Sequence, residues 1–214
     1  MDTHVTFVLD SSGSMAKIEA DTVGGFNSFL DEQRGEEGNA TVSLYDFDSS
    51  VDRVYHGEDI EEAPELDAET YTPSGRTALH DAIVTAIDGT ESYLAALDAA
   101  DRPESVVIVI LTDGKENASE TSQQTVRNQV EYRREELEWE FLFIGANQDA
   151  ALTAEGMGMD SKKSLDMAHS GEGARSAYES TSKRISNARR AGETGGFDED
   201  DRKRQSEAGR SDTE

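Results

Sequence analysis

Two apolar runs of strand character each end next to an aspartate and small polar residues. Residues 5–9 (VTFVL) precede Asp10, and residues 106–110 (VVIVI) lead into Thr112 and Asp113. Continuous apolar runs of this length are typical of parallel strands that are covered on both faces. The chain is therefore expected to build a sheet between two layers of helices. In such a sheet the loops that follow the strands meet at the carboxyl edge, where ligands usually bind.

The remaining pattern alternates between strands and helices, which predicts a doubly wound (Rossmann-like) α/β fold. We expect a mostly parallel sheet with helices on both faces. A turn at 48–50 makes the segment that follows it one antiparallel edge strand. The predicted strands lie at about residues 3–9, 40–47, 51–55, 105–112, 139–144 and 164–168, and the predicted helices near 18–34, 79–97, 126–137, 148–155 and 172–190.

The apolar pattern stops near residue 190. Beyond Ala191 the only large apolar residue is Phe197, which lies among glycines and charges. We therefore predict one domain over residues 1–190 and an acidic, disordered tail over residues 191–214.

A pair of glycines, Gly24 and Gly25, interrupts the first predicted helix. Each glycine costs about 1 kcal/mol of helix propensity. Close packing of the helix against the sheet is the expected compensation.

The net charge is strongly negative. The 214 residues include 46 acidic and 20 basic side chains, for a formal charge of −26, and the basic residues are 14 Arg and 6 Lys. Such a chain repels itself in dilute buffer, whereas at molar salt the Debye length falls to ~3 Å and screens the repulsion. This composition favours a protein of a salt-accumulating halophile over an ordinary acidic mesophilic protein.

Several classes of function are disfavoured by composition. No run of Lys or Arg forms a basic stripe, so we expect neither nucleic acid nor an anionic membrane as partner. The absence of cysteine excludes disulfides, thiolate metal sites and cysteine nucleophiles. No stretch approaches the ~18 apolar residues of a membrane span, and the first residues do not form a signal peptide. We therefore expect a cytoplasmic protein.

Candidate metal ligands come from three separate segments. Asp10, Ser12 and Ser14 alternate after the first strand, Thr77 precedes a helical pattern, and Asp113 follows the second apolar run. Two carboxylates and three hydroxyls at one sheet edge would make an all-oxygen site, suited to Mg²⁺, Mn²⁺ or Ca²⁺ rather than zinc. A cation held largely by neutral oxygens remains electrophilic and would accept a carboxylate from another protein.

Each of these segments also has a structural explanation. Ser12 fits a turn or a helix cap, Thr77 could cap a helix that begins at Ala78, and Asp113 with Gly114 is a common turn. Their joint occurrence at the ends of elements favours a site over three unrelated turns.

The pattern Asp10-x-Ser12-x-Ser14, with Thr77 and Asp113, resembles the metal-ion-dependent adhesion site (MIDAS) of von Willebrand factor A (vWA) domains. The resemblance covers about residues 3–190 and is strongest to stand-alone prokaryotic members. It implies that Ser12, Ser14 and Thr77 contact the metal and that Asp10 and Asp113 bind it through water. The implied cofactor is Mg²⁺, with Mn²⁺ or Ca²⁺ as alternatives.

The resemblance also implies a function. Many vWA domains are interaction modules, so the expected partner is a protein that presents Asp or Glu to the metal. Some family members act beside ring-forming ATPases, which makes such an ATPase a candidate partner.

An enzyme is the alternative from another class. A Mg²⁺-dependent phosphohydrolase could use Asp10 as nucleophile and the cation as Lewis acid. Aspartyl phosphatases normally carry Asp-x-Asp, however, and this chain has Ser12 at the second position. No nucleophile–base pair is identifiable, so we expect a binding protein and not an enzyme.

Other polar residues near these motifs have weaker signals. The four histidines are scattered, and none is paired at zinc-ligand spacing. His80 lies one helical turn after Thr77 and could approach the metal, but we expect it rather to cap the helix or to be partly exposed. Glu116 and Asn117 are candidates for the rim of the site, where a partner would contact them.

Overall fold

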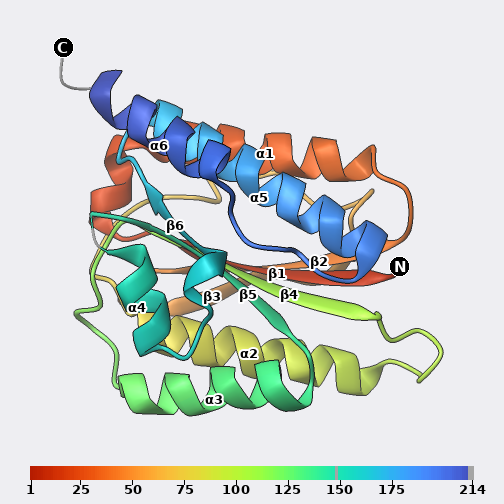
Figure 1. Ribbon diagram of the computed structural model, residues 1–214. Coiled ribbons are helices and arrows are strands. Elements are labelled where there is room, and N and C mark those ends of the chain that lie inside the picture. Colours follow the sequence, from red (N-terminus) through yellow and green to blue (C-terminus); the bar gives the residue numbers. More distant parts are fainter. Residues whose placement is uncertain (148, 212–214) are drawn as a thin grey trace.

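The computed structural model describes residues 1–147 and 149–211. Its centre is a six-stranded sheet in the order β3-β2-β1-β4-β5-β6 (Figure 1). All neighbouring strands are parallel except β2 and β3, which are antiparallel, as predicted. The strands are β1 (Thr3–Asp10), β2 (Ala40–Phe47), β3 (Val51–Asp59), β4 (Ser105–Thr112), β5 (Glu140–Ala146) and β6 (Ser164–Met167).

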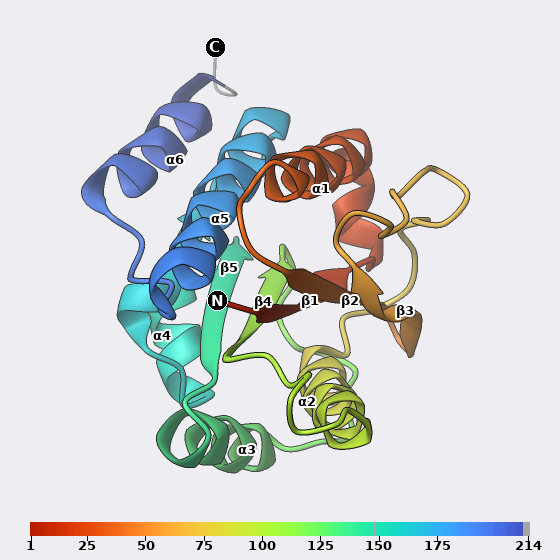
Figure 2. The same cartoon turned by 90° about the vertical axis from the view of Figure 1, so that its right-hand side faces the viewer.

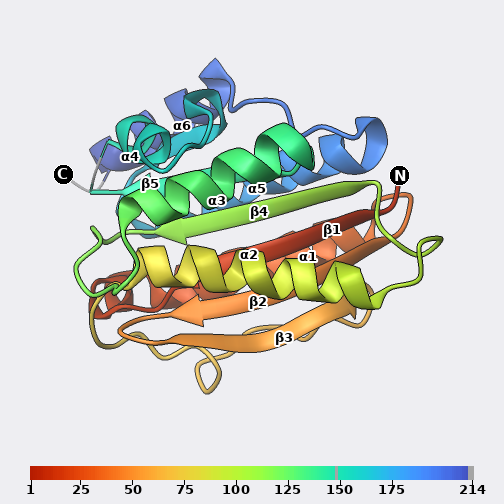
Figure 3. The same ribbon diagram turned by 90° about the horizontal axis from the view of Figure 1, so that it is seen from below.

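Helices cover both faces of the sheet (Figure 2). One face carries α1 (Glu19–Arg34) and α5 (Gly171–Ala191). The opposite face carries α2 (Leu79–Ala96), α3 (Gln123–Glu136) and α4 (Ala150–Gly156), of which α2 and α3 lie in front of the strands in Figure 3. Short 3₁₀ turns, η1 (Gly13–Lys17) and η2 (Ser161–Lys163), complete the connections. The predicted fold class is confirmed.

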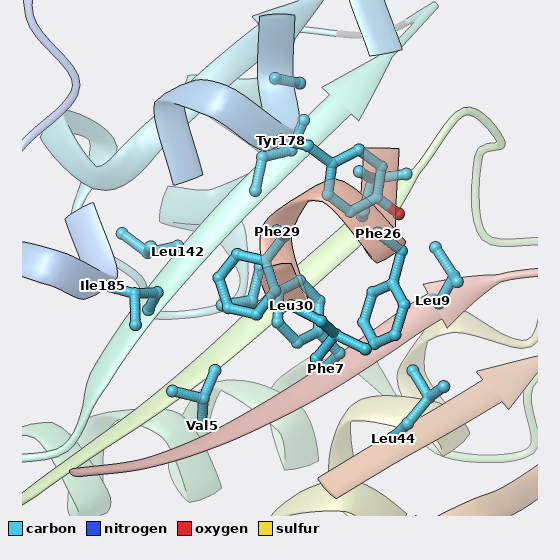
Figure 4. Packing of buried hydrophobic residues seen from close by; sticks show 14 of the residues in the cluster. Val5, Phe7, Leu9, Phe26, Phe29, Leu30, Leu44, Leu142, Tyr178 and Ile185 are labelled. Carbon is cyan, nitrogen blue, oxygen red and sulfur yellow. The ribbon is translucent and has the colours of Figure 1, made fainter. Parts of the chain in front are cut away.

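The central strands are apolar because both of their faces are covered. Every residue of β1 and of β4 is buried. On the side of α1 and α5, Phe7 packs edge-on against Phe26 and Phe29, with ring centroids 5.2 and 4.8 Å away (Figure 4). Tyr178 of α5 closes this cluster above Phe26. The packing buries β1 against both helices of this face.

The prediction of a disordered tail is wrong for most of its length. Glu199–Ser211 form a helix, α6, which packs beside α5 and β6 (Figure 1). Its buried face consists of Asp201, Gln205 and Ala208, at helical spacing. Two of these three residues are polar, so the apolar periodicity that reveals most amphipathic helices is missing. Residues 212–214 of the predicted tail lie outside the described residues.

Polar contacts hold α6 in place. The side chain of Gln205 accepts a hydrogen bond from the Ala168 backbone N–H at 2.9 Å and donates to the Gly173 carbonyl at 3.0 Å. Asp201 lies 3.4 Å from the guanidinium of Arg184 on α5. Buried polar groups stabilise a contact only when they are paired, as they are here. The chain between α5 and α6 adds Phe197, which is buried in the core cluster.

The two glycines of α1 differ in their surroundings. Gly25 faces the ring of Tyr178, and a Cβ atom there would clash with that ring, whereas a Cβ at Gly24 would meet nothing within 4 Å. The predicted close packing is therefore present at Gly25 only, and it is made with α5 rather than with the sheet.

This difference gives a matched pair of substitutions. Gly25→Ala is expected to destabilise the protein by about 1–3 kcal/mol because it overpacks the contact between α1 and α5. Gly24→Ala is expected to stabilise it by up to about 1 kcal/mol because alanine is the better helix former. Thermal unfolding of both variants measures the effects. Equal shifts in the same direction would contradict this packing.

None of the helices in the described part of the chain is both long and apolar enough to span a membrane.

Candidate metal centre

The two aspartates lie at the ends of neighbouring strands. Asp10 is the last residue of β1, and Asp113 directly follows β4. The two strands are in register up to Leu9 and Leu111, so both carboxylates lie at the same carboxyl edge. The loops into η1 and α3 leave the sheet at this edge (Figure 1).

The serines of the first segment are connected to Asp113 by hydrogen bonds. The Ser14 hydroxyl donates to Oδ1 of Asp113 at 2.6 Å, and the hydroxyl oxygens of Ser12 and Ser14 lie 3.2 Å apart. Asp113 and Ser12 are buried, whereas Ser14 is exposed. The cluster is therefore open to solvent on the side of Ser14.

The segment that contains Thr77 is attached to the Asp10–Ser14 segment by backbone hydrogen bonds. The Ser74 N–H donates to the Ser11 carbonyl at 2.7 Å, and the Gly13 N–H donates to the Gly75 carbonyl at 3.3 Å. The Thr77 hydroxyl lies against Gly114, where an added Cβ would be 2.6 Å from Oγ1. The fold thus brings Thr77 next to Asp113, and all three predicted segments meet at one place.

Neither hydroxyl that could have capped a helix does so. Ser12 is the N-cap of η1 but its side chain makes no capping hydrogen bond. The N-cap of α2 is Ala78 rather than Thr77, and it too lacks a side-chain cap. Neither the Ser12 nor the Thr77 side chain therefore caps a helix.

Asp10 is a buried carboxylate at the base of the site. Its Oδ1 accepts from the Ser12 N–H at 2.7 Å and its Oδ2 from the Thr112 hydroxyl at 2.5 Å. Burial raises the pKa of Asp10, hydrogen bonds from Thr112 and Ser12 oppose this, and the nearby Asp113 raises it further. The site thus holds negative charge that is costly to keep buried, and a bound cation would offset that cost.

Sequence reasoning missed two residues that hold Asp10. Thr112 is polar at the end of an otherwise apolar strand, a signal that could have identified it. The Tyr71 hydroxyl donates to the Asp10 carbonyl at 2.5 Å from a loop 61 residues away. No sequence pattern indicates that contact.

Glu116 and Asn117 do not have free side chains. Glu116 accepts hydrogen bonds from the backbone N–H groups of His80, Ala118 and Ser119. Partial burial acts to raise the pKa of Glu116, but these donors outweigh it and the pKa is lowered overall. The side-chain oxygen of Asn117 accepts a hydrogen bond from the Thr77 N–H at 3.0 Å, and the backbone N–H of Asn117 donates to the Thr77 carbonyl at 3.0 Å. The two residues position the Thr77 loop.

One histidine belongs to the cluster. His169 follows β6, and its Nε2 lies 2.8 Å from Oδ2 of Asp113. Both atoms are buried, and neither makes a hydrogen bond. His169 follows a predicted strand in the same way as Asp10 and Asp113, but this pattern alone does not say where that strand lies in the sheet. His80, by contrast, has Nδ1 3.2 Å from the Thr121 carbonyl and lies outside the cluster.

The side chains fit a divalent cation. Within the described ranges no three His, Cys, Asp or Glu side chains are placed to hold a metal by themselves. Hydroxyls would therefore have to complete the coordination, and Ser12, Ser14 and Thr77 are the ones available. The buried Oδ2 of Asp113, which lacks a hydrogen bond, is the kind of acceptor that a cation satisfies.

Comparison with solved structures identifies the fold. The zinc-occupied MIDAS form of proximal thread matrix protein 1 from the mussel byssus has a TM-score of 0.60 at 14% identity over 84% of this chain. The pilus adhesin SpaC from Lactobacillus rhamnosus GG in its open conformation has a TM-score of 0.66 at 14% identity over 87% of this chain. The ArnB paralog VWA2 from Sulfolobus acidocaldarius has a TM-score of 0.55 at 16% identity over 85%.

The domain therefore has a vWA-like fold, with the predicted MIDAS residues at its carboxyl edge. The chain spans less than half of each of these three structures, 46%, 30% and 44% of their lengths. No protein-family model and no curated protein matches the sequence.

Proposed function

We propose that this protein is a divalent-cation-dependent interaction module, in which the metal bridges to an Asp or Glu side chain of a partner protein. The observation that carries the proposal is the hydrogen-bonded cluster of Ser12, Ser14 and Asp113, which is open to solvent at Ser14. A cation there would have protein ligands on its buried side and a free position facing solvent. From the oxygen ligands alone, Mg²⁺ is the expected ion.

Two of the similar structures support this proposal. The mussel protein holds zinc at its MIDAS motif, and SpaC is a pilus adhesin. Carried over to this chain, these two descriptions favour a metal-mediated contact with another protein. A ring-forming ATPase is one partner of this kind that we propose to test.

Phosphohydrolase activity has less support. Both carboxylate oxygens of Asp10 already accept hydrogen bonds, and the residue is fully buried. A nucleophile needs a free oxygen within reach of the substrate. Asp10 is better suited to orienting the Ser12 loop.

The test uses peptides selected from a random library for binding to the protein in molar KCl with Mg²⁺ or Mn²⁺. Selected peptides are expected to contain an Asp or Glu that is required for binding. Its replacement by Asn or Gln should weaken binding at least ~10-fold, a loss of ~1.4 kcal/mol. EDTA should abolish binding.

A surface variant of the protein tests whether binding responds to any loss of negative charge. Asp88→Ala removes one carboxylate from the exposed face of α2 and should leave peptide binding unchanged. Peptides that bind equally well in EDTA, or that lack any essential carboxylate, would overturn the bridging mechanism.

A further inference from the structure

His169 lies against the carboxylate oxygen of Asp113 that Ser14 does not contact. Asp113 has Ser14 on one carboxylate oxygen at 2.6 Å and His169 on the other at 2.8 Å. Ser14 is in turn 3.2 Å from Ser12. Four side chains thus form a continuous series of ligand-type atoms that ends in an imidazole nitrogen.

The spacing between Asp113 and His169 matches that of two ligands of one cation. Two atoms bound at about 2.1 Å and at right angles lie ~3 Å apart. Oδ2 of Asp113 and Nε2 of His169 lie 2.8 Å apart, close to this value. The contact between His169 and Asp113 is close enough for an ion pair, yet neither atom makes a hydrogen bond. A shared metal would satisfy both atoms.

The residues on either side of His169 in the sequence make hydrogen bonds that hold its backbone in place. The preceding residue, Ala168, donates its N–H to Gln205 of α6 at 2.9 Å. The following residue, Ser170, caps α5 by accepting the Gly173 N–H at 3.1 Å. A Cβ at Gly173 would clash with the Ala168 carbonyl, so this loop packs closely on the start of α5. Preorganised ligands bind a metal without the cost of ordering a loop.

We propose that His169 is a nitrogen ligand of the metal bound at this site and gives it a preference for transition-metal dications such as Zn²⁺ or Co²⁺ over Mg²⁺. The proposal rests on the proposed function, because it assigns the metal class of the same site. Imidazole suits zinc, copper, iron and nickel, whereas Mg²⁺ prefers oxygen. The oxygen ligands by themselves favour Mg²⁺, so the imidazole is what would change the preference.

The experiment compares the wild type with His169→Gln and His80→Gln by calorimetric titration with Zn²⁺, Co²⁺ and Mg²⁺ at pH 7.5 in molar KCl. The wild type should bind Zn²⁺ and Co²⁺ more tightly than Mg²⁺. His169→Gln should lower the affinity for both transition metals by about 10–100-fold and change Mg²⁺ affinity little. His80→Gln makes the same chemical change outside the cluster and should leave all three affinities as in the wild type.

A spectroscopic readout separates a ligand from a positioning residue. In ¹⁵N NMR of the histidine side chains, the Nε2 resonance of His169 should shift on addition of Zn²⁺ but not of Mg²⁺. The absence of the signal in His169→Gln assigns it, and circular dichroism verifies that the variant is folded. An Nε2 signal that ignores Zn²⁺, or equal losses of Zn²⁺ and Mg²⁺ affinity in the variant, would overturn the proposal.

Failure of this inference differs from failure of the proposed function. A wild type that binds Mg²⁺ and carboxylate peptides, with no change of metal preference in His169→Gln, contradicts only the role of His169. A wild type that binds none of the three ions contradicts both.

Discussion

Lowering KCl from about 1 M to about 0.1 M is expected to unfold this domain. The Debye length grows from ~3 to ~10 Å over that range, so that carboxylates on neighbouring parts of the surface repel one another. With a net charge of −26 the repulsion acts over the whole molecule. The far-ultraviolet circular dichroism signal should lose its cooperative thermal transition at low salt.

Surface ion pairs stabilise the folded state but are too weak to compensate for the repulsion among the carboxylates. Pairs such as Arg127 with Glu131 and Lys183 with Asp198 are partly exposed on both sides. Such pairs contribute about 0–1 kcal/mol each, and less in salt. The 46 acidic residues outnumber the basic ones by more than two to one, so most carboxylates have no cation to pair with.

A non-ionic solute provides the control. Sucrose at the same osmolarity as the KCl favours compact states but does not screen charge, so it should restore less stability than KCl. A melting temperature that stays the same from 1 M to 0.1 M KCl would refute the halophile hypothesis. The fold assignment would be unaffected by that result.

Asp113→Ala should abolish stabilisation by divalent metal. At about 100 times its dissociation constant, a cation that binds only the folded state stabilises it by ~2.7 kcal/mol. For a domain of this size each kcal/mol raises the melting temperature by ~2–4 °C, so the wild type should gain several degrees. The variant should gain none, because it loses the carboxylate that both Ser14 and His169 contact.

Without metal the same substitution should change stability little or increase it. Asp113 contributes to the raised pKa of Asp10, so its removal lowers the cost of keeping Asp10 ionised. Ser14 loses its acceptor, but it is exposed and water can replace the carboxylate.

The charge control for this experiment is again Asp88→Ala, which should keep the full metal-dependent gain. Differential scanning calorimetry with and without metal measures both effects in one series. An Asp113→Ala protein that is still stabilised by metal to the wild-type extent would place the metal elsewhere.

Much of this protein was predictable from its sequence because the determining signals are local. The apolar runs that became β1 and β4 are buried on both faces, and only a sheet between two helical layers provides that environment. Strand ends in such a sheet converge. Asp10, Ser12, Ser14 and Asp113 could therefore be grouped without coordinates, Thr77 was added by the resemblance to the MIDAS pattern, and the structure brings them together.

Other features depended on contacts between distant segments. The helix α6 docks through Gln205, whose partners, the Ala168 N–H and the Gly173 carbonyl, lie more than thirty residues earlier in the chain. A helix held by polar side chains has no apolar stripe, so nothing in its own sequence distinguishes it from a solvated tail.

His169 illustrates the same limit at the metal centre. Histidine spacing in the sequence gave no reason to connect it with Asp113, 56 positions before it. The order of strands decides the matter, because β5 and β6 follow β4 in the sheet and bring the loop after β6 to the same edge. By itself the sequence determined the fold class and grouped the candidate oxygen ligands. Only the tertiary structure placed a nitrogen among them, since through-space proximity is created when the sheet assembles.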